Sequence, residues 1–169
     1  MFKPEVEKAI LSQIAKEIYS SNLYLAMASW AQSQGYSGTS KWLYAQSDEE
    51  RLHTIKFINY INDRGGYAVI PSTDAPPMQY ESIQSIFEQV LEHELMISES
   101  INEIVSVCMA QKDYTTLNWM QWFVNEQIQE EASVSIILDK LKLLNGQNMY
   151  LFDRDIFALR SAQTNSTTI

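Results

Sequence analysis

The hydrophobic residues of this chain recur every three or four positions through several long segments, which is the periodicity of amphipathic α-helices. Residues 5–34, 39–64 and 78–145 contain neither glycine nor proline. The last of these segments is too long for an ordinary helix and is interrupted by the polar run 112–116. The pattern therefore predicts four long helices, at about 5–34, 40–64, 80–110 and 114–145, and a short fifth helix at about 151–160 before a polar end.

The lengths of the connections predict how these helices are arranged. Short turns near residues 35–39 and 111–116 make antiparallel neighbours of the first and second helices and of the third and fourth. The connection between the second and third helices has about 15 residues, which reach about 50 Å when extended, whereas a 27-residue helix is about 40 Å long. The sequence thus predicts one all-α domain over residues 1–169, a ferritin-like four-helix bundle with one long crossover between helices two and three.

Each long helix carries side chains that could bind a metal ion, namely carboxylates, an amide or an imidazole, on its otherwise apolar face. These residues are Glu17 on the first helix, Glu50 and His53 on the second, Glu94 on the third, and Gln127 and Glu130 on the fourth. Burying a carboxylate is costly unless it is protonated, paired with a cation or bound to a metal. Cationic residues are scarce on these faces, so a metal ion is the simplest neutralising partner. A polar core residue with a hydrogen-bond partner is the alternative for any single glutamate.

The spacing of Glu50 and His53 also favours a metal site. They are one helical turn apart, so a carboxylate oxygen and an imidazole nitrogen point toward one centre. An isolated Glu-x-x-His is common by chance, but di-iron carboxylate bundles combine one glutamate from each of two helices with Glu-x-x-His from each of the other two. The fourth helix departs from this pattern, with Gln127 and Glu130. Such an oxygen-rich set suits iron or manganese better than a tetrahedral structural zinc.

Composition and charge narrow the range of partners. The 12 lysines and arginines against 21 acidic residues give a net charge of −9, which disfavours nucleic acid as a partner. No apolar run is long enough for a membrane helix, which needs about 20 residues. The start of the chain shows no secretory signal, and the single Cys108 cannot form an internal disulfide, so we expect a cytoplasmic protein. Cys108 itself is interpreted as a small buried hydrophobic residue.

Several segments in the right order make nearly the whole chain resemble the bacterial non-haem ferritins. These segments are Lys3-Pro4-Glu5, Glu17-Ile18-Tyr19-Ser20-Ser21 leading to Tyr24, Glu49-Glu50-x-x-His53, Gln111-x-Asp113-Tyr114, and Trp122-Phe123-Val124-x-Glu126-Gln127-x-x-Glu130. The resemblance implies an iron-storage ferroxidase. In this family a di-iron centre within each subunit oxidises ferrous iron with dioxygen or hydrogen peroxide. The ferric product is then stored as mineral inside a hollow homo-oligomeric cage, usually of twenty-four subunits.

The resemblance also assigns roles to individual residues. The residues matching the ligands of the first iron are Glu17, Glu50, His53 and Glu94, and those surrounding the second iron are Glu94, Gln127 and Glu130. Glu50 would bridge the two ions, and Gln127 would act through its amide oxygen or through water. Tyr24 matches the family's tyrosine beside the centre, which holds a hydrogen bond or lends an electron. A core tyrosine with a satisfied hydroxyl explains Tyr24 equally well.

A third iron site of the family uses acidic residues that flank the centre, and Glu49, Glu126 and Glu130 match it. Gln129 stands where related chains carry another glutamate, so one ligand of this site is lost. A solvated helix edge explains Glu49 and Glu126 as well as a metal site does. His93, at the edge of the third helix's apolar face, is interpreted as a surface residue or a neighbour of the ligands rather than a ligand.

Other functions fit parts of the pattern. A haem-containing bacterioferritin is the nearest alternative, but such proteins keep a second Glu-x-x-His on the fourth helix, and Leu52 stands at the position of their haem methionine. DNA-protecting mini-ferritins bind iron between subunits, whereas the candidate ligands here lie within one bundle. A non-enzymatic helical scaffold with buried polar glutamates stays open. So does a di-iron oxygenase, which would need an apolar substrate channel.

Overall fold

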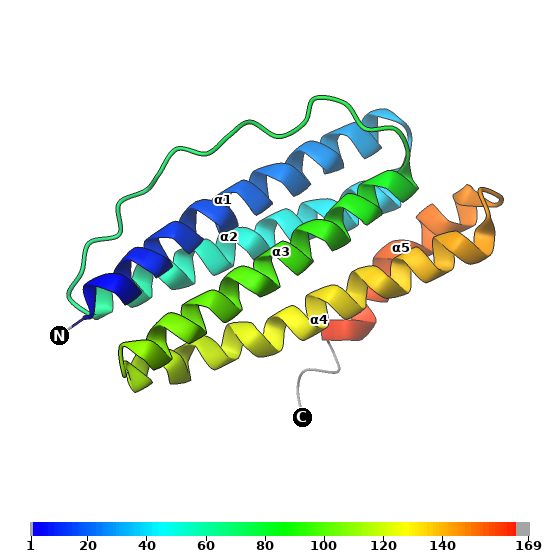
Figure 1. Ribbon diagram of the computed structural model, residues 1–169. Helices are drawn as coiled ribbons and strands as arrows, with labels where there is room; N and C mark the ends of the chain where they lie inside the picture. The colour runs from blue at the N-terminus through cyan, green and yellow to red at the C-terminus, as the bar shows by residue number, and fades with distance from the viewer. Residues whose placement is uncertain (1, 165–169) are drawn as a thin grey trace.

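Five helices make up most of the part of the chain that the structure describes (Figure 1). They are α1 (Pro4–Ser33), α2 (Ser37–Asp63), α3 (Ile83–Ala110), α4 (Tyr114–Leu144) and α5 (Met149–Thr164). This computed structural model describes residues 2–164, with side chains described for residues 2–160. Residue 1 and the polar end at 165–169 lie outside the described residues. The all-α fold class predicted from the hydrophobic periodicity is confirmed.

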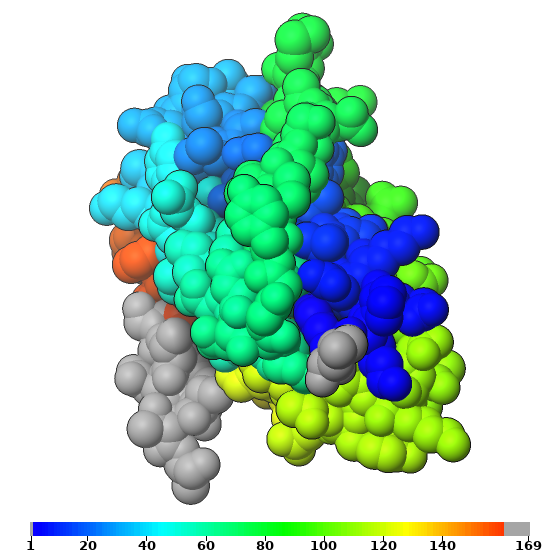
Figure 2. Space-filling view, turned by 90° about the vertical axis from the view of Figure 1, so that its left-hand side faces the viewer, coloured from blue at the N-terminus to red at the C-terminus, as the bar shows by residue number. Residues whose placement is uncertain are grey.

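Helices α1 to α4 form an elongated bundle of two antiparallel pairs, α1 with α2 and α3 with α4 (Figure 1). The connection between α2 and α3, residues 64–82, runs along the outside of the bundle from one end to the other. In the space-filling view it lies across the surfaces of α1 and α2 (Figure 2). This crossover lets α3 run parallel to α2, as the length of the connection predicted.

The start of α2 depends on a contact with the C-terminal helix. The helix begins at Ser37 rather than near residue 40, so Gly38 lies inside its first turn. The Asp153 carboxylate accepts hydrogen bonds from the backbone nitrogens of Gly38 (2.9 Å) and Thr39 (2.8 Å), which caps otherwise unpaired N–H groups. A Cβ atom at Gly38 would lie 1.6 Å from the Asp153 carbonyl oxygen. Gly38 is therefore required by the close packing of α5. It lies inside α2, whereas the sequence pattern placed it in the turn before this helix, so that expectation is wrong.

Local capping sets the boundaries of α3 and α5. The Ser82 hydroxyl accepts a hydrogen bond from the Ser85 backbone nitrogen (3.0 Å), so α3 begins at Ile83 rather than near residue 80. Left-handed Asn145 ends α4, and α5 then spans residues 149–164, beyond the expected 151–160. Helix α5 folds back along the bundle and packs on α2 and α4 (Figure 1).

Two apolar cores fill the bundle, one on each side of a central polar layer. The core near α5 contains residues such as Trp42 and Phe87, and the core at the other end contains residues such as Ile14 and Phe57. Between them on the helices lie four glutamates, with exposed fractions of 1% for Glu17, 2% for Glu50, 1% for Glu94 and 5% for Glu130. The burial predicted for these acids is confirmed, as is that of Cys108, which is fully buried.

Within the part of the chain that the structure describes, no helix combines the length and the apolar character needed to cross a membrane.

Candidate metal centre

The middle of the bundle brings six sequence-predicted residues together from all four long helices. We call them the inner group: Glu17 from α1, Glu50 and His53 from α2, Glu94 from α3, and Gln127 and Glu130 from α4. All six are buried, with Gln127 the most exposed at 7%. Each side chain reaches this layer because it lies on the apolar face that its helix turns toward the bundle axis. The fold therefore concentrates acidic side chains where water is largely excluded.

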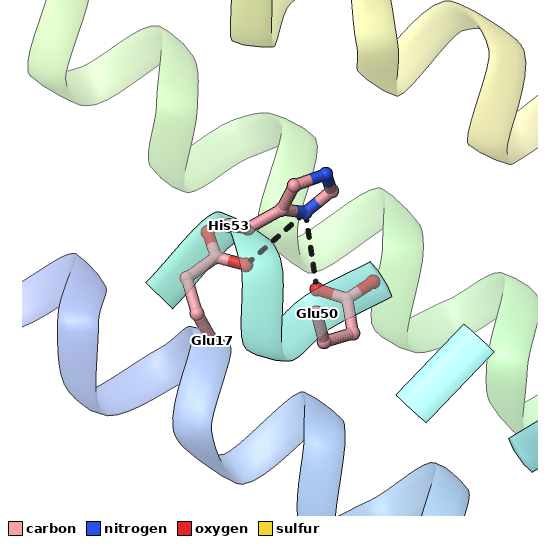
Figure 3. Close-up of side chains that lie close together, drawn as sticks. All are labelled: Glu17, Glu50 and His53. Carbon is pink, nitrogen blue, oxygen red and sulfur yellow. Dashed lines mark ion pairs between the residues drawn. The ribbon is translucent and has the colours of Figure 1, made fainter. Parts of the chain in front are cut away.

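Three members of the inner group are close enough to share one ion (Figure 3). The His53 Nδ1 atom lies 3.4 Å from Glu50 Oε2 and 3.8 Å from Glu17 Oε2. One ligand atom from each of the three residues lies within 4.8 Å of the others. Glu17 Oε2 is buried and finds no hydrogen-bond partner among the described residues. Since an unsatisfied buried oxygen is costly, its position beside two further ligand atoms fits a bound cation.

Glu94, on α3, lies in the same layer and accepts hydrogen bonds from two neutral side chains. The Tyr24 hydroxyl donates a hydrogen bond to Glu94 Oε1, and Gln127 Nε2 donates one to Glu94 Oε2 (3.2 Å). Tyr24 is fully buried and its pKa is held well above the ordinary value, by burial first and then by the charge of Glu94. Tyr24 therefore keeps its proton. Because the amide nitrogen of Gln127 faces Glu94, its oxygen is the atom left to approach a metal.

Two buried glutamines that the sequence reasoning missed also hold the inner group. Gln13 Nε2 donates to Glu17 Oε1 (2.8 Å), and Gln46 Nε2 donates to Glu130 Oε2 (2.7 Å) and to Glu50 Oε1 (3.4 Å). Each glutamine precedes a predicted ligand by four residues. That spacing places both on the same helix face and was the signal that could have found them.

His93 lies beside the inner group without joining it. Its Nε2 atom is 2.7 Å from the Ser20 hydroxyl, and its ring meets the Tyr24 ring edge-on at 5.8 Å. The residue is 8% exposed, so it is a neighbour of the centre and not a surface residue. Burial lowers the pKa of His93 to about 4, so the ring is neutral near pH 7. A neutral ring adds no positive charge next to the carboxylates.

Burial and mutual repulsion control protonation in the inner group. Burial, then the charges of neighbouring carboxylates, raise the pKa of Glu130 to about 8, and burial also raises the pKa of Glu94 to about 7. The pKa of Glu50 is likewise held well above its ordinary value, by burial first. Burial alone would lower the pKa of His53, but contact with Glu17 and Glu50 outweighs it and raises the pKa to about 11. A cation that enters the group therefore displaces protons.

A second, more exposed set of acids borders the inner group. We call Glu49 and Glu126 the outer group. Together with His53, they offer ligand atoms that lie within 4.8 Å of one another. Burial and then the charge of Glu49 raise the pKa of Glu126. Gln129, which the resemblance matches to a glutamate position of the third iron site, is exposed. Trp122 packs edge-on against His53, with ring centres 5.6 Å apart.

Comparison with known proteins identifies the family. The family model described as a ferritin-like domain matches residues 7–144. This chain belongs to the ferritin family. The ferritin is 41% identical over 158 residues to a probable bacterial non-heme ferritin-like protein of Haemophilus influenzae, covering 92% of this chain and 96% of the relative. It is 39% identical to a bacterial non-heme ferritin of Campylobacter jejuni, covering 92% and 95% of the two chains.

Solved structures agree with this assignment. The crystal structure of an open pore ferritin from the archaeon Archaeoglobus fulgidus matches with a TM-score of 0.89 and 37% identity, covering 92% of this chain and 96% of the other. The resemblance to non-haem ferritins and the ferritin-like fold are thereby confirmed. This ferritin carries a buried cluster of carboxylates and a histidine whose donor set fits a metal ion.

Proposed function

We propose that this ferritin stores iron and that its inner group is a ferroxidase centre. The observation that carries the proposal is the buried trio of Glu17, Glu50 and His53, whose ligand atoms converge around an unsatisfied carboxylate oxygen. Glu94 and Glu130 add two more buried carboxylates from the other pair of helices. A scaffold has no need for so many buried acids, since each one is costly unless it is neutralised.

The geometry supports two ferrous ions per subunit. Glu17 and His53 belong to the first ion, and Gln127 and Glu130 to the second. The two oxygens of Glu50 face different partners, since Oε2 lies 3.4 Å from His53 and Oε1 accepts a hydrogen bond from Gln46 (3.4 Å), which would suit a carboxylate shared by the two ions. Glu94 accepts hydrogen bonds from two neutral donors, Tyr24 on α1 and Gln127 on α4, and would likewise be shared by the two ions. Carboxylates favour the harder ferric ion over the ferrous ion, which lowers the barrier to electron loss.

Two adjacent ferrous ions can give up two electrons together. Dioxygen accepts these two electrons and two protons to become hydrogen peroxide, and hydrogen peroxide accepts two electrons and two protons to become two waters. Glu94 and Glu130 have raised pKa values, so they release protons close to the reaction when the ions bind. Tyr24 keeps its proton and holds Glu94 in place from α1.

We infer that the ferric product is stored as mineral in a hollow cage of many copies of this chain, twenty-four in the family's usual arrangement. The family membership and the match over nearly the full length of the relatives support such an assembly. The net charge of −9 suits a particle that collects cations and disfavours nucleic acid. The cytoplasm is the expected compartment.

Stopped-flow absorbance tests the ferroxidase proposal. Metal-free protein is mixed with a few ferrous ions per subunit in aerated buffer, and the ferric product is followed in the near ultraviolet. We expect fast oxidation in the wild type and its loss in the double variant Glu50→Ala/His53→Ala. Glu92→Ala is a control for the loss of an acidic side chain outside the inner group, because Glu92 is an exposed residue of α3. If the wild type oxidises ferrous iron no faster than buffer alone does, the ferroxidase proposal is wrong, and the buried acids serve the structure or bind another metal.

A further inference from the structure

The C-terminal helix reaches the metal centre through Arg160. Its guanidinium pairs with the Glu49 carboxylate of the outer group. It also donates hydrogen bonds to Gln46 Oε1 (2.6 Å) and to the Ala45 carbonyl oxygen (3.3 Å), and it lies 5.6 Å from the centre of the Trp42 ring. Several simultaneous partners fix a planar guanidinium far better than one exposed ion pair does. Arg160 is therefore a built part of this region, with 18% of its side chain exposed.

The docking of α5 keeps Arg160 in this position. Asp153 of the same helix caps the start of α2 with two hydrogen bonds, and Phe152 and Ile156 are buried against the bundle. The close approach at Gly38 leaves no room for a side chain between the two helices. The helix that carries Arg160 is thus held on α2, which also carries Glu49.

Arg160 places a permanent positive charge at the outer group. Glu49 and Glu126, with His53, are the set of ligand atoms near enough to bind an ion there. Because Glu49 already pairs with Arg160, an ion that uses this carboxylate must compete with the guanidinium. Gln129 offers no carboxylate to compensate, since it is an exposed amide.

The same arginine orients a side chain of the inner layer. A guanidinium has only donors, so the oxygen of the Gln46 amide must face Arg160. The amide nitrogen is thereby directed at Glu130 (2.7 Å) and Glu50 (3.4 Å). A continuous chain of contacts therefore runs from α5 through Gln46 to two predicted iron ligands.

We propose that Arg160 is a positioning residue that acts as a built-in cation at the outer group. It competes with a divalent metal ion for Glu49, and through Gln46 it holds Glu130 and Glu50 for the inner group. The inference rests on the proposed function of the inner group. The proposed function gives two tightly bound ions per subunit. The role of Arg160 adds that a third ion binds at Glu49 only when Arg160 is displaced.

Counting redox-inert zinc ions tests this proposal independently of oxidation. The assembled, metal-free protein is titrated with zinc by calorimetry, and bound metal is measured after equilibrium dialysis. We expect two tight ions per subunit in the wild type. In Arg160→Gln a third ion should bind, with an affinity raised about tenfold or more, a size typical of coupling between neighbouring sites. Arg154→Gln is the matched control, because it removes the same charge from an exposed position of α5 that pairs with Asp155.

Two further variants locate the effect. Arg160→Gln/Glu49→Gln should lose the third ion again, and its persistence would show that the ion does not bind at Glu49 and would overturn the proposal. Arg160→Lys keeps the charge without the planar fork, so its third-ion affinity should lie between those of the wild type and Arg160→Gln. Equal third-ion binding in the wild type and Arg160→Gln, whether both bind it or neither does, would also refute the competition. A wild type lacking the two tight ions would contradict the proposed function instead.

Discussion

The inner and outer acidic groups both lie next to His53, but they differ in how deeply they are buried and in which side chains contact them. The four glutamates of the inner group are at most 5% exposed, and they are held by neutral donors, Tyr24 and the buried glutamines, and by His53. In the outer group, Glu49 is 29% exposed at its side chain and pairs with Arg160. The charge of an acidic residue at the surface of the bundle can be neutralised by an arginine or solvated by water. Acidic residues in its middle layer have a geometry that favours a metal ion, so burial rather than the number of acids distinguishes the two groups.

Removing an inner glutamate should have the largest effect. In Glu17→Ala and in Glu94→Ala we expect fast iron oxidation to fall by more than about 100-fold, beyond the range for residues that only orient ligands. The helices should still form, and the metal-free variants should unfold at a higher temperature than the metal-free wild type, because buried charge is relieved. Stopped-flow absorbance and thermal unfolding followed by circular dichroism measure the two effects.

Wild-type oxidation rates in both of these variants would show that the inner group does not catalyse iron oxidation. The exposed Glu92→Ala is the control for the loss of one acidic residue of α3.

The second expected effect is a pH dependence of stability that belongs to the inner group. In the folded protein the pKa values of Glu94 and Glu130 are raised from the ordinary 4.5 to about 7 and about 8. Over this interval the folded chain holds protons that the unfolded chain has lost, so the stability of the metal-free protein should fall as pH rises from about 4.5 to about 8. The raised pKa of His53 acts in the same direction above pH 6.5, whereas the lowered pKa of His93 acts in the opposite direction between about pH 4 and 6.5 and so offsets part of the fall there.

The melting temperature of the metal-free protein, measured between about pH 5 and pH 8, checks this sign. A change of 1 kcal/mol shifts the melting temperature of a domain of this size by about 2–4 °C. Glu94→Gln should flatten the dependence, and bound metal should reverse it because metal competes with protons. A melting temperature that rises over this range in the metal-free wild type would contradict the assignment of the raised pKa values.

The smallest effect is expected at the outer group. In Glu126→Gln the first fast oxidation phase should change by less than about tenfold, since the residue lies beside the inner group and is only half-buried. Repeated additions of ferrous iron, followed by stopped flow, separate this phase from later turnovers. A loss as large as that of Glu17→Ala would mean that the two groups act as one site.

Much of this molecule could be predicted from patterns within single helices. The apolar periodicity predicted the helices and the buried glutamates, and the long connection predicted the crossover. What the sequence did not reveal depends on contacts between distant segments. Arg160 meets Gln46 across 114 positions of the chain, and Gly38 became intelligible only once Asp153 was seen to pack against it. The metal that the inner group would bind and the roles of its residues stay predictions, because the fold and the burial of these side chains do not determine them.

The crossover also has a consequence for how the chain folds. It separates two hairpins, α1–α2 and α3–α4 (Figure 1). Glu17 and Glu50 belong to the first hairpin, and Glu94 and Glu130 belong to the second. Each hairpin is built from contacts close in sequence, which form quickly, whereas docking the two hairpins must close the long loop. Docking also brings like charges together, so uptake of protons or of ferrous iron should accelerate this last step. Ferrous iron would then also help newly made chains to fold.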